Sequence, residues 1–380
     1  MSYLNYQIMN TPTGWRKILH LNWPLVVLQA AVAGIGFLML YSVGGGDLHR
    51  WAEPQMKRFA VGMLASVGLA FVPLWFWRGI AVPAYLASIG LLVLVDLIGS
   101  VGMGAQRWID IGPIQLQPSE LAKISLVILL AAYYDWLTPA RRSRLFWVLL
   151  PVILVLAPTG LVLIQPDLGT ALMLVMGGGI VMFAAGVSLW YFAAVIGMGV
   201  GAVWTVLASR GTSWQLLRDY QFRRIDTFLD PSTDPLGAGY NIAQAQIALG
   251  SGGWSGRGFM QGTQSRLNFL PEKHTDFIFT TLAEEFGFVG ASSLLLLYVL
   301  IVGFCLFSAL TNRDRFAALM TIGVAGTFFL YFAINMGMVM GLLPVVGVPL
   351  PMVSYGGTQM VIMLIAFGIV QSAHVHRPRS

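Results

Sequence analysis

Charged side chains are scarce in this chain. Only 10% of its 380 residues are Asp, Glu, Lys or Arg, whereas a soluble globular domain carries about 25%. Hydrophobic residues make up 57% of the sequence, and the mean hydropathy is +0.75. Apolar runs of roughly 18 residues or more, enough to cross a bilayer, recur from Leu21 to Val375. The composition excludes a soluble protein and places most of the chain in a membrane.

Cysteine is almost absent. The one cysteine, Cys305, falls within an apolar run, which excludes an intrachain disulfide and a cysteine-based metal site. The formal net charge of +6 does not call for a nucleic-acid partner, because arginines on cytosolic loops account for it in a membrane protein. The first apolar run, Leu21–Val43, is too long for a signal peptide and is predicted to be a retained helix.

Charged and Pro/Gly-rich breaks divide the apolar sequence into about ten predicted transmembrane helices. Each is long enough for a hydrocarbon core of ~30 Å at 1.5 Å per residue. The predicted spans are 21–43, 58–77, 79–99, 119–137, 145–164, 169–187, 189–209, 277–310, 315–341 and 357–375. The predicted fold is an all-α polytopic membrane protein, with residues 1–380 forming one integral membrane domain.

Lys and Arg set the predicted orientation, since they accumulate on the cytosolic side. With the N-terminus inside, the inner connections hold Arg16, Lys17, Arg78, Arg141, Arg142, Arg144, Arg313, Arg315, Arg377 and Arg379. Residues 1–20 and 376–380 are then cytoplasmic. Residues 210–276 form a long polar outer loop between helices seven and eight. Loops of this length are usually functional or disordered, and its aromatic residues argue against disorder.

The few charges near the membrane gather on one side. A charge at mid-membrane costs roughly 2.5–3.5 kcal/mol, so each calls for a partner or a function. On the predicted topology, a set of them lies at or just below the outer edge: Arg107, Glu120, Lys123, Asp167, Asp276, Glu284 and Glu285, with Asp96 close by. Structural ion pairs would be spread over both halves. The clustering therefore indicates a polar site near the outer face.

Several of these residues have a structural alternative. Glu120 and Lys123 are three apart and can pair along one helix, with Ser119 capping its start; either this pair is an internal salt bridge, or Lys123 also faces a polar cavity. Asp167 follows Pro166 and suits a helix N-cap. Arg107 and Trp108 together suit a headgroup anchor.

The long outer loop is rich in arginine, which suits phosphate groups. Its arginines are Arg210, Arg218, Arg223, Arg224, Arg257 and Arg266. Asp226, Asp230 and Asp234 have an even spacing, but the intervening prolines favour turns over a metal site. The glycines of GSGGWSGRGFMQGTQS do not form a nucleotide P-loop.

Five stretches resemble the ordered motifs of a known family: QRWIDIGPIQLQPSELAKI, LIQPDLGTALML, DPLGAGYNIAQAQIALGSGG, GTQSRLNFLPEKHTDFIFTTLAEEFG and GLLPVVGVPLPMVSYGGTQM. They resemble the SEDS proteins (shape, elongation, division and sporulation), and the similarity runs from about residue 20 to 375. GTQSRLNFLPEKHTDFIF and LAEEFG are closer to the elongation members than to the division members. The resemblance implies a peptidoglycan polymerase of a bacterial inner membrane, with an active site facing the periplasm.

The resemblance also implies a substrate, site residues and partners. The substrate is lipid II, a disaccharide-pentapeptide carried on undecaprenyl pyrophosphate. The family's essential aspartate, in its HTDF motif, falls on Asp276, and Glu120, Lys123 and Asp167 match charged positions lining the family's central cavity. The implied partners are a class B penicillin-binding protein, which is a single-span transpeptidase, and other membrane proteins of the elongation complex.

The chemistry fits these residues. An α-linked donor and a β-1,4 product require inversion, and a carboxylate can take the proton of the attacking hydroxyl; Asp276 is the predicted base. Pyrophosphate leaves without an acid but needs positive charge, from Lys123, the loop arginines, or a divalent cation such as Mg²⁺ or Mn²⁺ for which the sequence shows no convincing ligand set.

Further predicted substrate contacts come from around the same site. Glu284, eight residues after Asp276, is roughly 80° round an ideal helix and is expected to line the same cavity. Lys273 and Ser354 are also predicted to contact substrate, together with Arg107 and Trp108. Glu285 is expected to be structural, and His274 is expected to orient its neighbours.

Two other functions fit the composition. A lipid II flippase has the same kind of intramembrane polar cavity, and a scaffold would only recruit other cell-wall proteins. The sequence does not distinguish donor from acceptor residues, and it does not reveal the partner interface, the direction of strand growth or the oligomeric state.

Overall fold

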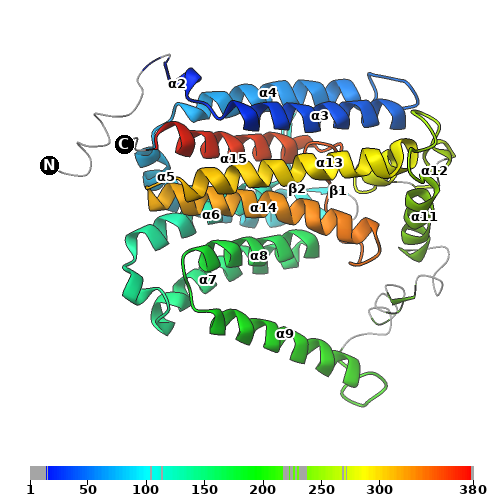
Figure 1. Ribbon diagram of the computed structural model, residues 1–380. Coiled ribbons are helices and arrows are strands. Elements are labelled where there is room, and N and C mark those ends of the chain that lie inside the picture. Colours follow the sequence, from blue (N-terminus) through cyan, green and yellow to red (C-terminus); the bar gives the residue numbers. More distant parts are fainter. Residues whose placement is uncertain are drawn as a thin grey trace.

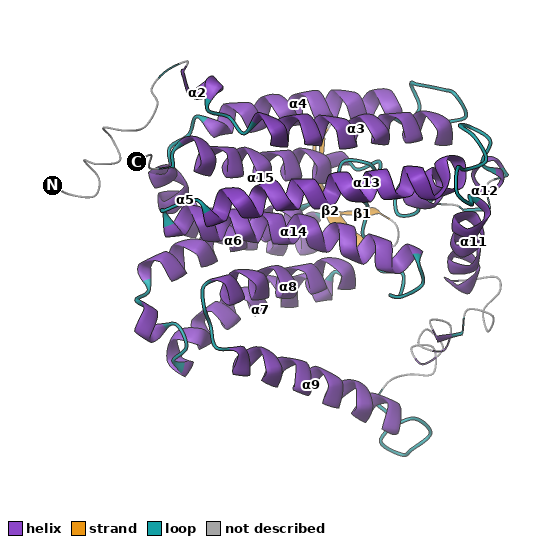
Figure 2. Ribbon diagram, viewed as in Figure 1, coloured by secondary structure: helices purple, strands orange, loops and turns teal. Residues whose placement is uncertain are grey.

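Long apolar helices dominate the computed structural model, which describes residues 14, 16–102, 105–112, 114–216, 222, 226, 229–230, 238–267, 269–270 and 272–377. Among these residues, seven helices are long and apolar enough to cross a membrane: α3 (Trp23–Val43), α5 (Leu74–Ile98), α7 (Leu145–Ile164), α9 (Leu189–Ala208), α13 (Ile278–Leu310), α14 (Arg315–Val339) and α15 (Gly357–Val375). This confirms a polytopic, mostly helical protein (Figure 2).

Three further helices lie among these seven: α4 (Ala52–Ala70), α6 (Pro118–Trp136) and α8 (Leu168–Ala184). The 17 residues of α8 make it a short apolar helix, while α4 and α6 each carry several charged residues. Ten crossings and the position of the long loop between helices seven and eight therefore stay predictions.

The boundary between α4 and α5 differs from the predicted one. Helix α4 ends at Ala70, and Pro73 directly precedes α5. Since proline has no N–H with which to continue a helix, the break between the two helices falls here. The sequence analysis placed this break at Arg78. In the structure Arg78 lies within α5, where Asp135 at 3.1 Å and Asp314 at 3.2 Å pair with its guanidinium.

These ion pairs also correct the expected one-sided distribution of charge. Asp314 is buried and caps α14 through the backbone N–H of Ala317. The three residues of these pairs come from different helices: Arg78 from the start of α5, Asp135 from the end of α6, and Asp314 from the start of α14. These helix ends lie at the end of the bundle that also holds the described ends of the chain (Figure 1). A second set of paired charges thus joins three helices at the end opposite the predicted site.

A small antiparallel sheet corrects the all-α prediction. Strands β1 (Ser100–Gly102), β2 (Ala105–Ile111) and β3 (Ile114–Leu116) pair in that order, with Ser100 opposite Trp108 and Ile109 opposite Leu116. Alternating side chains in QRWIDI favour a strand, and the β2–β3 turn contains Gly112 at a φ of +61°. The sheet places Arg107 and Trp108 between α5 and α6.

Helices α14 and α15 form the centre of the bundle, with most of their residues buried. Around them pack α3 and α4 on one side and α6, α7 and α8 on the other, while α9 has no buried residue (Figure 1). The short helices are α2 (Arg16–Leu19), the 3₁₀ turn η1 (Pro139–Arg141), α11 (Ala238–Ser251) and α12 (Thr263–Arg266). The described termini share one end of the bundle, and α11 and α12 lie at the other (Figure 1).

Candidate active site

Asp276 stands on a tight turn immediately before α13. The backbone N–H groups of Thr275 and Phe277 both donate to the carbonyl of Glu272, at 3.2 Å each, which folds residues 272–277 into this turn. Burial raises the pKa of the Asp276 carboxyl to about 6, and the nearby charge of Glu272 adds to the rise. A carboxyl group that titrates near neutrality suits a general base.

Three successive backbone carbonyls hold this turn. The carbonyl of His274 accepts from the N–H of Tyr355 at 2.8 Å, that of Thr275 from the Ser354 hydroxyl at 2.6 Å, and that of Asp276 from the Asn335 amide at 2.9 Å. Fixed backbone on both sides of a side chain limits where that side chain can point. The proposed base is therefore anchored through its own peptide.

Two of these donors belong to the proline segment, residues 344–356 between α14 and α15. Its backbone is irregular and includes Gly347 at a φ of +69° and Met352 at +64°. A Cβ on Gly347 would lie 3.7 Å from Oδ2 of Asp276, so this segment passes directly beside the carboxylate.

Ser354 holds the proline segment together. Its buried hydroxyl accepts from the Leu350 N–H at 2.7 Å while donating to Thr275, and its carbonyl accepts from the Gln55 amide at 2.9 Å. Both hydroxyl contacts are to backbone. The structure therefore shows Ser354 as a residue that positions the Asp276 turn.

Aromatic rings and cations flank the turn. The ring of His274 stacks on Trp51 at 4.2 Å between centroids, and Tyr355 meets Trp51 edge-on at 4.8 Å. The guanidinium of Arg58 lies 4.7 Å from the centre of the Tyr355 ring, and that of Arg50 lies 5.7 Å from the centre of the Trp51 ring. His274 was expected to orient its neighbours, which stays a prediction; the structure shows its ring packed against Trp51.

Lys273 belongs to the same group of residues. Burial and, secondly, the nearby charge of Arg50 lower the pKa of its amine. Two like charges held close together raise the free energy of the site, and an anionic ligand would relieve that repulsion.

A second polar group is buried between α6 and α14. Lys123 Nζ donates to Glu120 at 2.7 Å and also contacts the Tyr331 hydroxyl, which donates to the other Glu120 oxygen at 2.6 Å. The predicted pairing of Glu120 with Lys123 is confirmed. The predicted cap at Ser119 is wrong: α6 begins at Pro118 after Gln117, with no side-chain cap.

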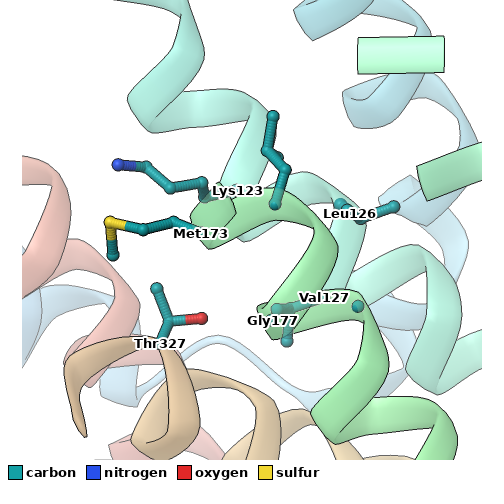
Figure 3. Close-up of a pocket in the computed structure, with 8 residues that line it drawn as sticks. Lys123, Leu126, Val127, Met173, Gly177 and Thr327 are labelled. Atoms are coloured by element: carbon teal, nitrogen blue, oxygen red, sulfur yellow. The ribbon is translucent and has the colours of Figure 1, made fainter. Parts of the chain in front are cut away.

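The hollow beside Lys123 is more apolar than expected. It is a narrow gap between α6, α8 and α14, and most of its lining is aliphatic or glycine, with Lys123 and Thr327 as its polar side chains. Figure 3 shows the stem of Lys123 running beside Met173. The ammonium group of Lys123 is bonded to Glu120 and Tyr331. This hollow is therefore not the polar cavity that Lys123 was predicted to face.

Arg107 and Asp167 meet at the start of α8. Arg107 donates to the carbonyls of Gln165, at 3.0 Å, and Pro166, and lies 3.8 Å from the Asp167 carboxylate. Asp167 caps α8 through the Thr170 N–H at 3.1 Å, which confirms the N-cap interpretation. Trp108, the next residue of β2, is half-buried.

Glu284 contacts a different segment from the one expected. Its side chain is completely buried, and one oxygen accepts from the N–H and hydroxyl of Thr263 and from the N–H of Gln264, at 2.7, 2.9 and 3.1 Å. Arg257 lies 4.0 Å away. These bonds cap α12 and fasten the outer loop to α13. Glu285 accepts from Ser42 at 2.5 Å and joins α13 to α3.

The glycine-rich stretch of the outer loop is bonded to a break in α13. Gly287 has a φ of +64° inside this helix. The Arg257 and Gly258 N–H groups donate to the Glu284 and Glu285 carbonyls at 3.0 Å each. A Cβ on Gly287 would lie 2.3 Å from the Gly256 nitrogen, so the glycines permit two backbones to touch.

The other loop residues are only partly described. Arg210 forms two 2.7 Å bonds to Asp226, and Arg266 is exposed. Arg218, Arg223, Arg224 and Asp234 lie outside the described residues. Within the described part of the chain, no three His, Cys, Asp or Glu side chains are grouped so that they could hold a metal ion.

Comparison with known proteins shows which family the chain belongs to. A family model described as cell cycle protein (FtsW/RodA/SpoVE) matches residues 23–379. This chain belongs to the FtsW/RodA/SpoVE family. The chain is 41% identical over 371 residues to the peptidoglycan glycosyltransferase MrdB of Escherichia coli, covering 97% of each chain. It is 36% identical to a probable peptidoglycan glycosyltransferase FtsW of Escherichia coli, covering 89% of this chain and 82% of the relative.

Solved structures of FtsW/RodA/SpoVE proteins are also similar. The rod shape determining protein RodA of Thermus thermophilus matches with a TM-score of 0.71 and 30% identity, covering 95% of this chain and 98% of the other. A chain from a structure of a peptidoglycan synthase complex, described as coordinating polymerization and crosslinking, matches with a TM-score of 0.80 and 34% identity, covering 93% of this chain and 97% of that one. The family resemblance expected from the motifs is confirmed.

The sequence analysis missed several residues of the site. Asn335, Tyr331 and Gln55 are polar residues buried in or against the bundle, which is a signal in itself because lipid-depth polar groups need a partner. Arg58 was missed as well, and its contact with the Tyr355 ring joins segments far apart in the sequence.

Proposed function

We propose that this protein is a peptidoglycan glycosyltransferase that polymerises lipid II into β-1,4 glycan strands during cell elongation, with Asp276 as the general base. One observation carries the proposal: a carboxyl group with a pKa of about 6 is held by its own backbone beside an irregular segment at one end of a membrane bundle. The relatives named peptidoglycan glycosyltransferase support the reaction class.

The reaction follows from this geometry. A sugar hydroxyl attacks the anomeric carbon of the donor, its proton passes to the Asp276 carboxylate, and the bond to pyrophosphate breaks with its electron pair on the leaving phosphate. Attack opposite the leaving group inverts the anomeric carbon. No acid partner is needed, since lipid pyrophosphate is a stable anion, whereas an alkoxide leaving group requires one.

The cations near the turn would stabilise the leaving pyrophosphate. Lys273, Arg50 and Arg58 lie with the aromatic rings around His274, and preorganised positive charge is a large source of transition-state stabilisation. Lys123 is placed deeper, in its pair with Glu120. Mg²⁺ or Mn²⁺ would add charge at the pyrophosphate, but the described residues form no three-ligand set for one.

The site would face the periplasm of a cell with an inner membrane. The described ends of the chain lie at one end of the bundle (Figure 1), and the arginine-rich connections of that end suit the cytoplasm. Asp276 precedes α13 at the other end. One similar chain comes from a peptidoglycan synthase complex, which supports a class B penicillin-binding protein as the partner.

A polymerisation assay tests the proposal. Purified protein is incubated with labelled lipid II in detergent, with and without Mg²⁺ or Mn²⁺, and the products are separated by size. We expect glycan strands from the wild type and none from Asp276→Ala. A flippase moves lipid II between leaflets without joining it, so a wild-type protein that translocates lipid II in vesicles and forms no polymer would establish the rival function.

A further inference from the structure

We infer that Asn335 is a positioning residue for the reaction: its amide fixes the peptide of Asp276 to α14 and to the proline segment, and thereby sets the position of the carboxylate. This inference rests on the proposed role of Asp276 as the base. Asn335 lies in α14 near its end and is completely buried.

The hydrogen bonds of Asn335 use both hydrogens of its amide. Its Nδ2 donates to the carbonyl of Asp276 at 2.9 Å and to the carbonyl of Val348 at 2.7 Å. Both partners are carbonyl oxygens, which only accept, so only the nitrogen of the amide can face them. An aspartate of the same shape would instead turn an oxygen toward two oxygens.

The other amide atom supports this interpretation. Oδ1 of Asn335 is buried and has no hydrogen-bond partner within the described residues. A buried acceptor without a partner costs free energy, and a purely apolar side chain would avoid that cost. The residue is therefore suited to the two bonds that its nitrogen donates.

Three groups donate hydrogen bonds to the carbonyls of residues 274–276 in the Asp276 turn, and Asn335 is the one that lies on a helix. Tyr355 and Ser354 belong to the proline segment, whereas Asn335 belongs to a central helix. Four residues earlier, on the same face of that helix, Tyr331 contacts Glu120 and Lys123. α14 thus connects the backbone of the proposed base to the buried ion pair at a fixed spacing of one turn.

Steady-state polymerisation by full-length protein with lipid II tests this role in Asn335→Ala and Asn335→Asp. Misplacing a reacting group by about 1 Å costs roughly 100-fold in rate, so we expect kcat to fall roughly 10- to 100-fold with KM changed less than about threefold. The control is Thr321→Val, a buried polar residue of α14 away from the site, expected within about twofold of wild type in kcat.

A pH profile separates positioning from general stability. A loosened turn lets water reach the carboxyl, so the acid limb of kcat moves to lower pH in the Asn335 variants. The neighbouring charges, Glu272 and Lys273 on the turn and Arg50 beside it, are the same in all of these proteins. A role confined to folding would reduce the active fraction and leave the acid limb in place.

The outcomes are distinguishable. Only folded, monodisperse protein is compared, and Asn335→Ser, which keeps one donor, replaces Asn335→Ala if that variant does not purify. Wild-type kcat and an unmoved acid limb in the Asn335 variants overturn this inference alone. An active Asp276→Asn protein, measured beside them, overturns the proposed function instead.

Discussion

The hydroxyl of Ser354 donates a 2.6 Å hydrogen bond to the carbonyl of Thr275, one residue before the proposed base. This bond joins segments that lie 79 residues apart, and the same hydroxyl accepts from Leu350. Ser354 therefore links the internal geometry of the proline segment to the turn that carries Asp276.

Ser354→Ala removes both bonds and leaves a buried carbonyl and a buried N–H unpaired. Each unpaired group costs about 1–3 kcal/mol, so the thermal midpoint should fall, and kcat should fall roughly 10-fold or more as the turn moves. The control is Ser308→Ala on α13, whose hydroxyl contacts His374 at the opposite end. If the substrate bound Ser354 directly, KM would rise instead of kcat falling.

The pH dependence of polymerisation should report Asp276. The base acts in its ionised form, and the pKa of its carboxyl is raised to about 6, so kcat should rise with pH through about 6 and then level off. Glu272→Gln removes the negative charge that contributes to this rise, and the acid limb should move to lower pH. Glu53→Gln removes a charge from the surface of α4, where it pairs with Lys57, and should leave the profile unchanged.

The buried pair of Lys123 and Glu120 allows structure and function to be separated. Glu120→Gln leaves Lys123 without its carboxylate, and breaking a buried pair costs roughly 3–5 kcal/mol. The double variant Glu120→Gln, Lys123→Met removes both charges and should recover most of the lost thermal stability. If the pair is only structural, polymerisation recovers as well; we expect it to stay low, because the resemblance places both residues in the family's central cavity.

Gly287 should be required for the contact between the outer loop and α13. An alanine there must adopt a φ of +64° with its Cβ about 2.3 Å from the Gly256 nitrogen, which no side-chain rearrangement relieves. Gly287→Ala should lower the thermal midpoint by several degrees and increase proteolysis of the outer loop. Gly303→Ala lies in the same helix with nothing near its Cβ and should be neutral or slightly stabilising.

The helices were predictable because a bilayer demands long apolar runs, and eight of the ten predicted spans coincide with a helix to within three residues at each end; the exceptions are 58–77 and 79–99, because α4 spans Ala52–Ala70 and α5 begins at Leu74. The predicted break fell at Arg78 because a charged residue within an apolar run was interpreted as a loop position. Arg78 is instead neutralised by acidic residues from α6 and α14, and such pairing is invisible in a single sequence. The sheet of β1 to β3 was missed because its strands are only three to seven residues long.

The site was predictable only where a motif or a local spacing marked it. Asp276 came from its motif, the Glu120–Lys123 pair came from a spacing of three residues, and the Asp167 cap came from the proline before it. Other contacts of the site join residues between 59 and 299 positions apart, through Asn335, Ser354 and Gln55. No local sequence pattern predicts such contacts. The contacts of Glu284 with the outer loop were not predicted, because an ideal helical wheel does not include the loop that folds over that face; its predicted contact with substrate stays a prediction.

The most direct measurement compares wild type and Asp276→Asn at pH 8 in two assays on the same preparations, lipid II polymerisation and thermal unfolding. Burial raises the pKa of Asp276, so its stabilising contribution is present in full below the unfolded pKa of about 4 and is lost as pH rises through about 6. At pH 8 the neutral amide should give a thermal midpoint equal to or above that of wild type, with no glycan strands formed. Asp276→Asn protein that is folded and still polymerises lipid II at the wild-type rate would contradict the account.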